Sequence, residues 1–251
     1  MGSLPDKTCL LSSPQRNETG KVFVWVRQSR RPFTRNEAGI FSASHLATPT
    51  KNQDLHGNVP DESSTVLILI DLINNFDFEG ADDLFEHAKA ITEPIATLRK
   101  KARREGIPVI YVNDNFGKWQ SDFKKLLAHC LRDDSRGKSI VKKLKPDEED
   151  YFVLKPKHSA FYSTTLEVVL DYLKAKTLIL VGIAGNICVW FTANDAFMRD
   201  YRLIIPSDCI ASESPRDNQY VLEQMAKILQ ADTRPSIEID LKALGRKKEK
   251  G

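Results

Sequence analysis

The sequence predicts an α/β fold in which a parallel sheet is covered by helices on both faces. Short apolar, β-branched runs alternate with amphipathic helical stretches from residue 64 onward, and this alternation requires crossover connections between parallel strands. The first run, residues 65–70 (TVLILI), is apolar without interruption, as expected for a strand buried on both faces. With 251 residues, of which 41% are hydrophobic, the chain is long enough for one such domain with a core.

The individual elements follow from the same patterns. The helix expected over 81–105 ends at Gly106, since glycine favours helix ends. The stretch 165–174 carries its leucines on one helical face. Six strands are expected, at 65–70, 108–112, 151–154, 177–181, 203–206 and, as an edge strand, 236–239. Helices are expected at 81–105, 121–132, 165–174, 186–199 and 215–229.

The two ends of the chain differ from its middle. Residues 1–62 are rich in Ser, Thr, Asn and Arg and lack periodicity, apart from a strand-like run at 21–27 (KVFVWVR). We expect a flexible extension there; a transit peptide is the alternative, but acidic residues interrupt it and no amphipathic helix is evident. The predicted organisation is an extension over 1–62, one domain over 63–240 and a charged tail over 241–251.

Composition excludes several classes of function. The net charge of +3 is small and the lysines are spread along the chain, which argues against a nucleic-acid surface. No apolar run reaches the roughly 20 residues of a membrane span, and the N-terminus does not resemble a secretory signal. Reduced thiols in a cytoplasmic protein are therefore expected, because no CxxC pair occurs among the four cysteines, Cys9, Cys130, Cys188 and Cys209.

Three predicted strand ends carry reactive side chains. Asp71 follows the first strand, Lys155 ends the third, and Cys188 follows the fourth after a glycine-containing loop. Ligands of such sheets bind beyond the carboxyl ends of the strands, and a carboxylate, an ammonium and a thiol there suit nucleophilic catalysis. Taken singly, each has a structural alternative: a turn-forming Asp, a solvated Lys and a core Cys. The first helical turn favours a thiolate at Cys188.

Three motifs carry a resemblance to a known family. They are ILIDLINNF around Asp71, VLKPKHSAF around Lys155 and VGIAGNICVWFTANDAF around Cys188. The third is the most specific, since a Thr-x-x-Asp-Ala continuation follows the cysteine. From about residue 64 to 240 the chain resembles the isochorismatase-like, nicotinamidase-related hydrolases.

The resemblance implies a fold and a set of roles. The fold is a three-layer α/β/α sandwich of Rossmann type around a mostly parallel six-stranded sheet, and a homo-oligomer is expected. Asp71, Lys155 and Cys188 correspond to a catalytic triad in which Asp71 accepts the thiol proton. A cis peptide between Ile183 and Ala184 is implied, with an oxyanion hole formed by the N–H groups of Ala184 and Cys188.

The chain departs from its nicotinamidase relatives at their metal site. Asp114 is kept, but Phe116 stands at the position of a metal-binding histidine, and the next histidine is His129. Two of three protein ligands are missing, so neither a metal nor another cofactor is expected. Cys188 also favours amide chemistry over the vinyl-ether hydrolysis of isochorismatases, which needs no thiol.

The resulting hypothesis is a metal-independent cysteine hydrolase that cleaves a C–N bond of a small amide, carbamoyl or ureido compound. The alternatives are a vinyl-ether hydrolase and a catalytically silent binding protein on the same scaffold. For the aromatic residues of the surrounding loops, core packing is the alternative to substrate contact, and His158 is either a hydrogen-bond donor to substrate or a solvated loop histidine. Substrate contacts are expected from Phe76, Trp119, His158 and Ile187.

Overall fold

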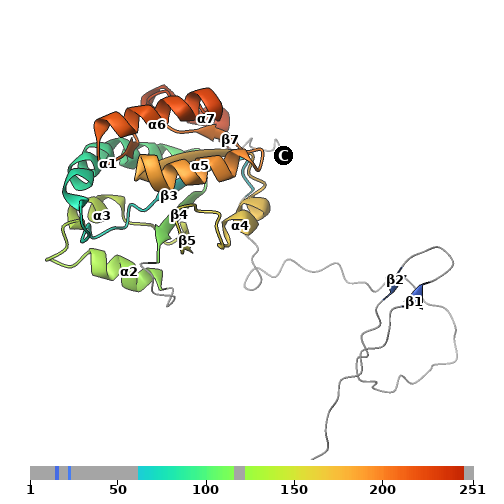
Figure 1. Ribbon diagram of the computed structural model, residues 1–251, viewed down its shortest axis with the longest axis horizontal. Coiled ribbons are helices and arrows are strands. Elements are labelled where there is room, and N and C mark those ends of the chain that lie inside the picture. Colours follow the sequence, from blue (N-terminus) through green and yellow to red (C-terminus); the bar gives the residue numbers. More distant parts are fainter. Residues whose placement is uncertain (1–14, 17–21, 24–61, 116–121, 246–251) are drawn as a thin grey trace, which may run out of the picture. The chain divides into compact units, whose positions relative to one another are not determined.

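A computed structural model of the protein describes residues 15–16, 22–23, 62–115 and 122–245 (Figure 1). The chain divides into two units, residues 1–50 and residues 51–251. In the first unit, β1 (Gln15–Arg16) pairs with β2 (Val22–Phe23) in an antiparallel two-stranded sheet, so a short strand falls within the predicted run 21–27. The other residues of the predicted extension lie outside the described part of the chain, except Glu62.

The second unit contains a six-stranded sheet in which every pair of neighbouring strands is parallel. The order is β5-β4-β3-β6-β7, and β8 also pairs with β6. The predicted fold class is confirmed, and the first five expected strands agree with observed strands to within three residues at either end. The strands are β3 (Thr65–Ile70), β4 (Val109–Asp114), β5 (Tyr151–Lys155), β6 (Thr177–Ile183), β7 (Arg202–Ile204) and β8 (Ile210–Ala211).

One predicted strand is wrong. The expected edge strand at 236–239 is instead a 3₁₀ helix, η3 (Ser236–Glu238), and β8 is the sixth strand. The carboxylate of Asp208 accepts hydrogen bonds from the backbone N–H and the hydroxyl of Ser236, both at 2.7 Å. The Asp208 carboxylate thus binds the N–H of Ser236, which in an edge strand would be available to a neighbouring strand.

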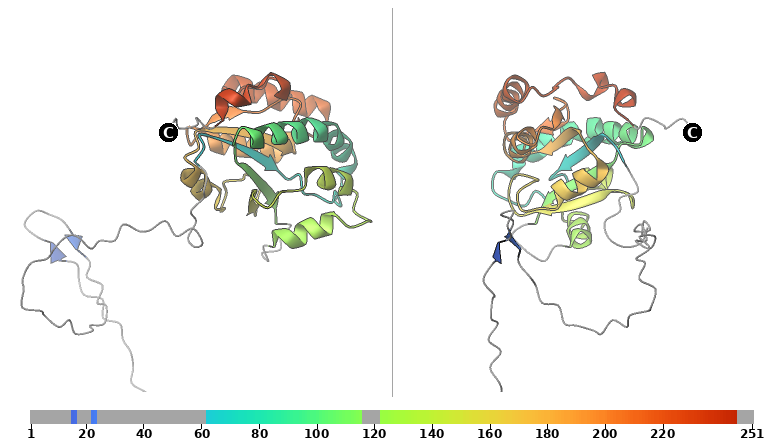
Figure 2. Two further views of the ribbon diagram at one scale, coloured as in Figure 1. Left: turned by 180° about the vertical axis from the view of Figure 1, so that it is seen from behind. Right: turned by 90° about the vertical axis from the view of Figure 1, so that its right-hand side faces the viewer.

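Helices cover both faces of the sheet, which confirms the three layers (Figure 2). The side chains of β3 alternate between the two interfaces: Leu67 and Leu69 lie in one apolar cluster, and Val66, Ile68 and Ile70 lie in the other. The first cluster includes α1 (Ala81–Arg104), α2 (Phe123–Cys130), α3 (Lys138–Leu144) and α7 (Leu241–Leu244). The second includes α4 (Leu166–Leu173), α5 (Trp190–Phe197) and α6 (Pro215–Ile228).

Two short helices were not predicted. α3 is a seven-residue segment with three lysines, and its Ile140, Val141 and Leu144 are buried against the first layer. α7 lies inside the segment expected to be a charged tail, and it begins with the buried Leu241. Helices of fewer than two turns carry too few residues for a helical period to stand out in the sequence.

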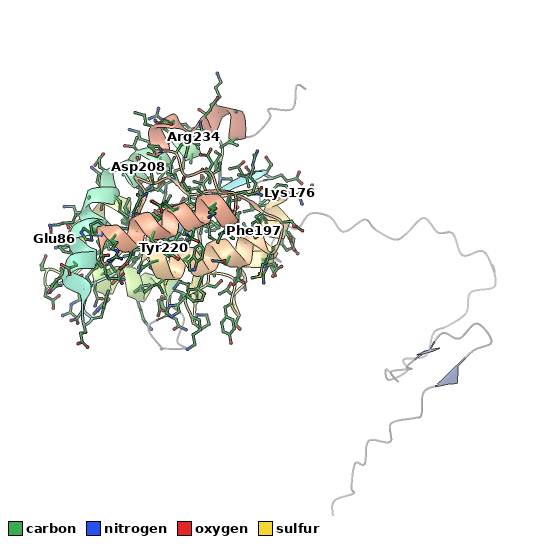
Figure 3. The ribbon with its side chains drawn as sticks, turned by 45° about the horizontal axis from the view of Figure 1, so that its top comes forward. Glu86, Lys176, Phe197, Asp208, Tyr220 and Arg234 are labelled. Carbon is green, nitrogen blue, oxygen red and sulfur yellow. The ribbon has the colours of Figure 1, made fainter. Side chains whose placement is uncertain are left out.

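In the second layer, α6 begins at a side-chain cap. Ser214 accepts a hydrogen bond from the N–H of Asp217 at the start of α6, with Pro215 in the first turn. Figure 3 looks onto this layer, where Tyr220 of α6 and Phe197 near the end of α5 are both exposed. Within the described ranges, no helix is long and apolar enough to cross a membrane.

Candidate active site

The candidate site lies where the strand order reverses. From β3 the chain builds β4 and β5 on one side, then returns to place β6 and β7 on the other. The carboxyl ends of β3 and β6 therefore lie at the switch point, where parallel sheets of this kind form their ligand crevice. Asp71 directly follows β3, and Lys155 is the last residue of β5. Cys188 lies in a π-helical turn, η2 (Gly185–Val189), that follows β6 and leads into α5.

A glycine permits the close approach of β6 to β3 at this crevice. Gly182 has a φ of 128°, and a Cβ atom there would lie 2.1 Å from the carbonyl oxygen of Ile70. No side chain fits that space, so only glycine can continue β6 past the end of β3. The peptide bond between Ile183 and Ala184, one residue further on, is cis, as the resemblance implied.

Lys155 is the buried cation of the site. Its side chain is 0% exposed, and its Nζ lies 2.8 Å from Oδ2 of Asp71 and 4.0 Å from Oδ2 of Asp114. Burial alone lowers the pKa of Lys155, but the negative charges around it, Asp71 first among them, raise that pKa above its ordinary value. The ammonium therefore stays charged at neutral pH and compensates the carboxylates beside it.

Asp71 is held in one orientation by its neighbours. Its Oδ1 accepts a hydrogen bond from the backbone N–H of Asp114 at 2.7 Å, while Oδ2 pairs with Lys155. The Asp71 N–H itself bonds to the carbonyl of Val112 at 2.8 Å, and its φ of 54° turns the chain out of the sheet. The carboxylate is 9% exposed as a side chain, so its two oxygens interact with protein rather than with bulk water.

Cys188 completes the triad geometry. Its Sγ lies 3.5 Å from Nζ of Lys155. Burial raises the pKa of the Cys188 thiol, and the charge of Asp71 raises it further, while Lys155 opposes the change. Burial and the adjacent carboxylate thus act against the thiolate that the helical turn is expected to favour.

A side-chain network that the sequence did not reveal clamps the turn before Cys188. The N–H of Asn186 donates to Oγ of Ser212 at 3.1 Å, and that hydroxyl donates to Oδ1 of Asn218 at 3.0 Å. A Cβ atom on Gly185 would lie 2.6 Å from Oδ1 of Asn218. The start of α6 thus fixes the backbone that precedes the thiol, and no local motif around Asn218 indicates this long-range contact.

The backbone groups proposed for the oxyanion hole lie in the same turn. The carbonyl oxygen of Ala184 accepts hydrogen bonds from the N–H groups of Ile187 and Val189, both at 3.1 Å. Ala184 is 8% exposed and Cys188 is partly buried. The structure places Ala184 and Cys188 at one end of the crevice, and their role toward an oxyanion stays a prediction.

His158 lies on the open side of the thiol. Its Nδ1 is 3.8 Å from Sγ of Cys188, and its ring packs against Phe191 with centroids 5.5 Å apart. The imidazole is exposed, whereas Lys155 and Asp71 are buried. Of the residues predicted to contact substrate, His158 is thus the one that the structure brings to the reactive sulfur.

The other three residues predicted to contact substrate are Phe76, Ile187 and Trp119, and the structure does not show any of them beside the Cys188 sulfur in the way that it shows His158. Phe76 is 1% exposed and packs edge-on against Phe85, with centroids 5.2 Å apart, which places its ring in the core. Ile187 is partly buried against the same apolar cluster as Phe76. Trp119 lies outside the described residues. Core packing is therefore the role that the structure assigns to Phe76.

Asp114, which by resemblance corresponds to a metal ligand of nicotinamidases, lies near the buried cation of the site. Asp114 ends β4, and its carboxylate points toward the buried ammonium of Lys155 at 4.0 Å. Across the part of the chain that the structure describes, no group of three His, Cys, Asp or Glu side chains could hold a metal ion. Phe116, the residue at the expected histidine position, lies outside that part.

Comparisons with known proteins agree with this geometry. A family model described as the isochorismatase domain matches residues 65–233. The isochorismatase family protein YaaI of Bacillus subtilis is 44% identical over 171 residues, covering 68% of this chain and 93% of YaaI. The isochorismatase of the same organism is 30% identical over 175 residues, and the match spans 67% of this chain but only 54% of that enzyme.

Among solved structures, the N-carbamoylsarcosine amidase of Thermoplasma acidophilum superposes with a TM-score of 0.56 and 28% identity. The match covers 70% of this chain and 99% of that amidase. The family model thus covers the residues of all six strands of the sheet and of the three motifs. This chain belongs to the isochorismatase family of hydrolases.

Proposed function

We propose that the chain is a cysteine hydrolase that cleaves a C–N bond of a small amide, carbamoyl or ureido compound, without a metal. One observation carries the proposal: the thiol of Cys188 lies 3.5 Å from the ammonium of Lys155, which is itself 2.8 Å from the carboxylate of Asp71. A nucleophile, a base and a buried cation within contact distance are the parts that acyl transfer needs. The substrate class is supported by the structural likeness to the N-carbamoylsarcosine amidase.

The proposed chemistry begins from the thiol. Because the pKa of Cys188 is raised, the proton moves to Asp71 as the sulfur attacks the substrate carbonyl carbon, rather than before the substrate binds. Lys155 keeps the charge of the site balanced while the proton moves. In this proposal the N–H groups of Ala184 and Cys188 hold the oxyanion, and such a donor is typically worth about 10²–10³ in rate.

Collapse of the tetrahedral intermediate breaks the C–N bond as Asp71 gives the former thiol proton to the departing nitrogen, and an acyl group stays on the sulfur of Cys188. Water then attacks the thioester carbon while Asp71 takes one of its protons, and Asp71 returns that proton to the sulfur as the C–S bond breaks. Each half of the cycle thus needs one proton transfer at the thiol and one at the departing or attacking group. The net reaction consumes one water and releases an amine or ammonia.

Vinyl-ether hydrolysis is the second candidate. It is favoured by the 30% identity to the isochorismatase of Bacillus subtilis, although that match covers little more than half of the enzyme. The two candidates differ in their need for sulfur, because the ether reaction proceeds without a covalent thiol intermediate. The cytoplasmic location and the homo-oligomer stay predictions from the sequence.

The test compares wild-type protein with Cys188→Ala on a panel of small carboxamides, N-carbamoyl amino acids and ureido acids, with ammonia release as the measurement. We expect turnover by the wild type, loss to background in Cys188→Ala, and an acyl group on the Cys188 peptide after an acid quench. Cys130→Ala is the matched control, since Cys130 is buried in α2 away from the triad. Turnover that survives in Cys188→Ala would show that the thiol mechanism is wrong.

A further inference from the structure

We infer that Thr192 is a positioning residue, whose hydroxyl ties the loop after Lys155 to the carbonyl of Cys188 and thereby holds the ammonium and the thiol at contact distance. The inference deepens the proposed function and rests on it, because the distance concerned joins two members of the proposed triad. It also gives a role to the Thr-x-x-Asp-Ala continuation that follows Cys188 in the sequence.

The sheet alone does not fix the contact between Lys155 and Cys188. Lys155 ends β5 and Cys188 follows β6, and the strands β4 and β3 lie between them. The hydrogen bonds of a ladder align only neighbouring strands, and among the strands that the structure describes no ladder joins β5 to β6. The distance of 3.5 Å between Nζ and Sγ therefore also depends on contacts outside the sheet.

The Thr192 hydroxyl supplies such a contact. Thr192 lies in α5, four residues beyond Cys188, and is 0% exposed. Its Oγ1 accepts a hydrogen bond from the N–H of Ala160 at 3.0 Å and donates one to the carbonyl oxygen of Cys188 at 2.7 Å. Ala160 is also 0% exposed, and it belongs to the loop that follows Lys155. One buried hydroxyl thus bridges this loop and the residue that carries the thiol.

The carbonyl that Thr192 binds lies where the backbone changes its helical type. Cys188 belongs to the π-helical turn η2, and α5 begins at Trp190. A π-helical turn departs from the regular α-helical hydrogen bonds, and a threonine hydroxyl can bond to the carbonyl four residues before it. The bond from Thr192 therefore fixes the peptide group of Cys188, from which the thiol side chain extends.

The Asp195 carboxylate fastens the same loop to α5 a second time. Oγ of Ser159 donates a hydrogen bond to Oδ2 of Asp195. The other carboxylate oxygen lies 3.4 Å from Nη1 of Arg199, which also donates to the Asp195 carbonyl at 3.0 Å. These contacts hold the loop to the helix, whereas the bond from Thr192 also reaches Cys188 itself. Thr192 is therefore the member of the continuation that couples the loop to the thiol.

The distance held in this way has an electrostatic consequence. Burial and the charge of Asp71 raise the pKa of the Cys188 thiol, and Lys155 opposes them. The interaction between two charges weakens as they move apart, so a looser loop reduces the help that the ammonium gives to a forming thiolate. The hydroxyl of Thr192 should therefore affect the reactivity of Cys188 without touching its sulfur.

Two substitutions separate the hydroxyl from the shape of the side chain. Thr192→Val keeps the branched shape and removes the donor and the acceptor, whereas Thr192→Ser keeps the hydroxyl and loses a methyl group. Thr92→Val is the matched control in α1, because the Thr92 hydroxyl donates to the carbonyl of Ala88, four residues earlier, at 2.7 Å. Urea unfolding of the full chain identifies conditions in which each variant is folded.

The first measurement is alkylation of Cys188 by iodoacetamide, followed by peptide mass spectrometry. We expect Thr192→Val to react severalfold more slowly than wild type, and Thr192→Ser and Thr92→Val to stay within about twofold. In the Lys155→Met background, Thr192→Val should have no further effect, since the ammonium whose position it changes is absent. If Lys155→Met does not fold, the comparison of Thr192→Val with Thr192→Ser decides the question.

The second measurement is acetylation of Cys188 by 4-nitrophenyl acetate in a single turnover, followed as the release of nitrophenolate. A misplacement of about 1 Å can cost about 10²-fold in rate, so the limiting acetylation rate of Thr192→Val should fall about 10–10²-fold. The half-saturating ester concentration should stay within about twofold, because the fully buried Thr192 does not contact the ester. A merely structural role would reduce the amount of folded protein and leave the rate per folded molecule unchanged.

Each contrary outcome overturns the inference for a different reason. Wild-type rates in Thr192→Val show that the hydroxyl does not position the thiol. An equal loss in Thr192→Ser attributes the effect to packing of the methyl group, and an equal loss in Thr92→Val attributes it to a general loss of helix stability. The proposed function fails separately: nitrophenolate release that is unchanged in Cys188→Ala refutes the thiol mechanism, while the alkylation rates still decide the role of Thr192.

Discussion

Two buried cations of this protein are compensated in different ways. Lys155 faces two carboxylates and a thiol at the edge of the sheet. Arg99 of α1, which is 9% exposed, donates to the carbonyl oxygens of Lys145 at 2.9 Å and Lys143 at 3.2 Å, and also to the hydroxyl of Tyr111. Both satisfy the rule that buried charges need partners.

The difference lies in what those partners can do. The carbonyls that Arg99 binds belong to the last turn and C-cap of α3, whose unpaired acceptors need donors, and the Tyr111 hydroxyl donates to the carbonyl of Leu144 at 2.7 Å. Burial raises the pKa of Tyr111 to about 12, so none of these partners titrates near neutral pH. The partners of Lys155 include a carboxylate and a thiol, which exchange a proton in the proposed mechanism. We therefore propose that Arg99 serves folding and Lys155 serves chemistry.

Replacement of Lys155 should have the largest effect on activity. Lys155→Met removes the charge that balances Asp71 while the proton moves, so we expect kcat/KM to fall by about 10²–10⁴-fold. The unpaired Asp71 should also cost about 3–5 kcal/mol of unfolding free energy. The double variant Lys155→Met/Asp71→Asn should recover part of that free energy in urea unfolding and none of the activity. Recovery of activity would show that the pair is only structural.

Replacement of Arg99 should reverse this pattern. Arg99→Met leaves the carbonyls at the end of α3 without their donor, and we expect a loss of about 2–4 kcal/mol in the free energy of unfolding. Activity per folded molecule should stay within about twofold of wild type, because Arg99 lies among α1, α3 and β4 rather than at the crevice. Urea unfolding and activity at the same protein concentration test both statements. A large fall in kcat of the folded protein would place Arg99 with Lys155.

The sequence predicts most of the scaffold, and it predicts that Asp71, Lys155 and Cys188 lie together, because both depend on local patterns. The run at 65–70 and its following Asp71 show a strand and its carboxyl end directly, and five strands were placed in this way. The sequence also predicts that Lys155 and Cys188 lie near Asp71, because the carboxyl ends of parallel strands meet at the same edge of the sheet. Sequence patterns therefore predict well the backbone that carries Asp71, Lys155 and Cys188.

Apart from the short helices α3 and α7, the features that the sequence missed depend on contacts between distant residues. The edge strand at 236–239 became η3 because Asp208 captures Ser236 across 28 positions. The contact of Ser212 with Asn186 likewise spans 26 positions. The raised pKa of Cys188 arises from burial and from Asp71, 117 positions away by subtraction of the residue numbers. Periodicity and turn chemistry carry no information about such pairs.

Removal of the Asp71 charge should make the Cys188 thiol react faster with an alkylating reagent, although hydrolysis of the substrate is lost. Asp71 raises the pKa of Cys188 and Lys155 lowers it, so Asp71→Asn leaves the lowering charge unopposed and increases the thiolate fraction at a given pH. We expect alkylation of Cys188 by iodoacetamide near pH 8 to become severalfold faster, while hydrolysis is lost. Peptide mass spectrometry separates Cys188 from the buried Cys130, whose pKa burial raises to about 11. Slower alkylation in Asp71→Asn would mean that the carboxylate activates the resting thiol.

An exposed cation gives the smallest expected effect. Lys89 pairs with Glu86 three residues earlier on α1 at 2.6 Å, but the two side chains are 44% and 63% exposed. Water solvates both charges before and after unfolding, so Lys89→Gln should change the free energy of unfolding by about 0.5 kcal/mol or less and leave activity unchanged. Urea unfolding of this variant beside Arg99→Met measures how much of the Arg99 effect comes from burial. If the two losses were equal, burial and partner type would not explain why Arg99 and Lys155 matter.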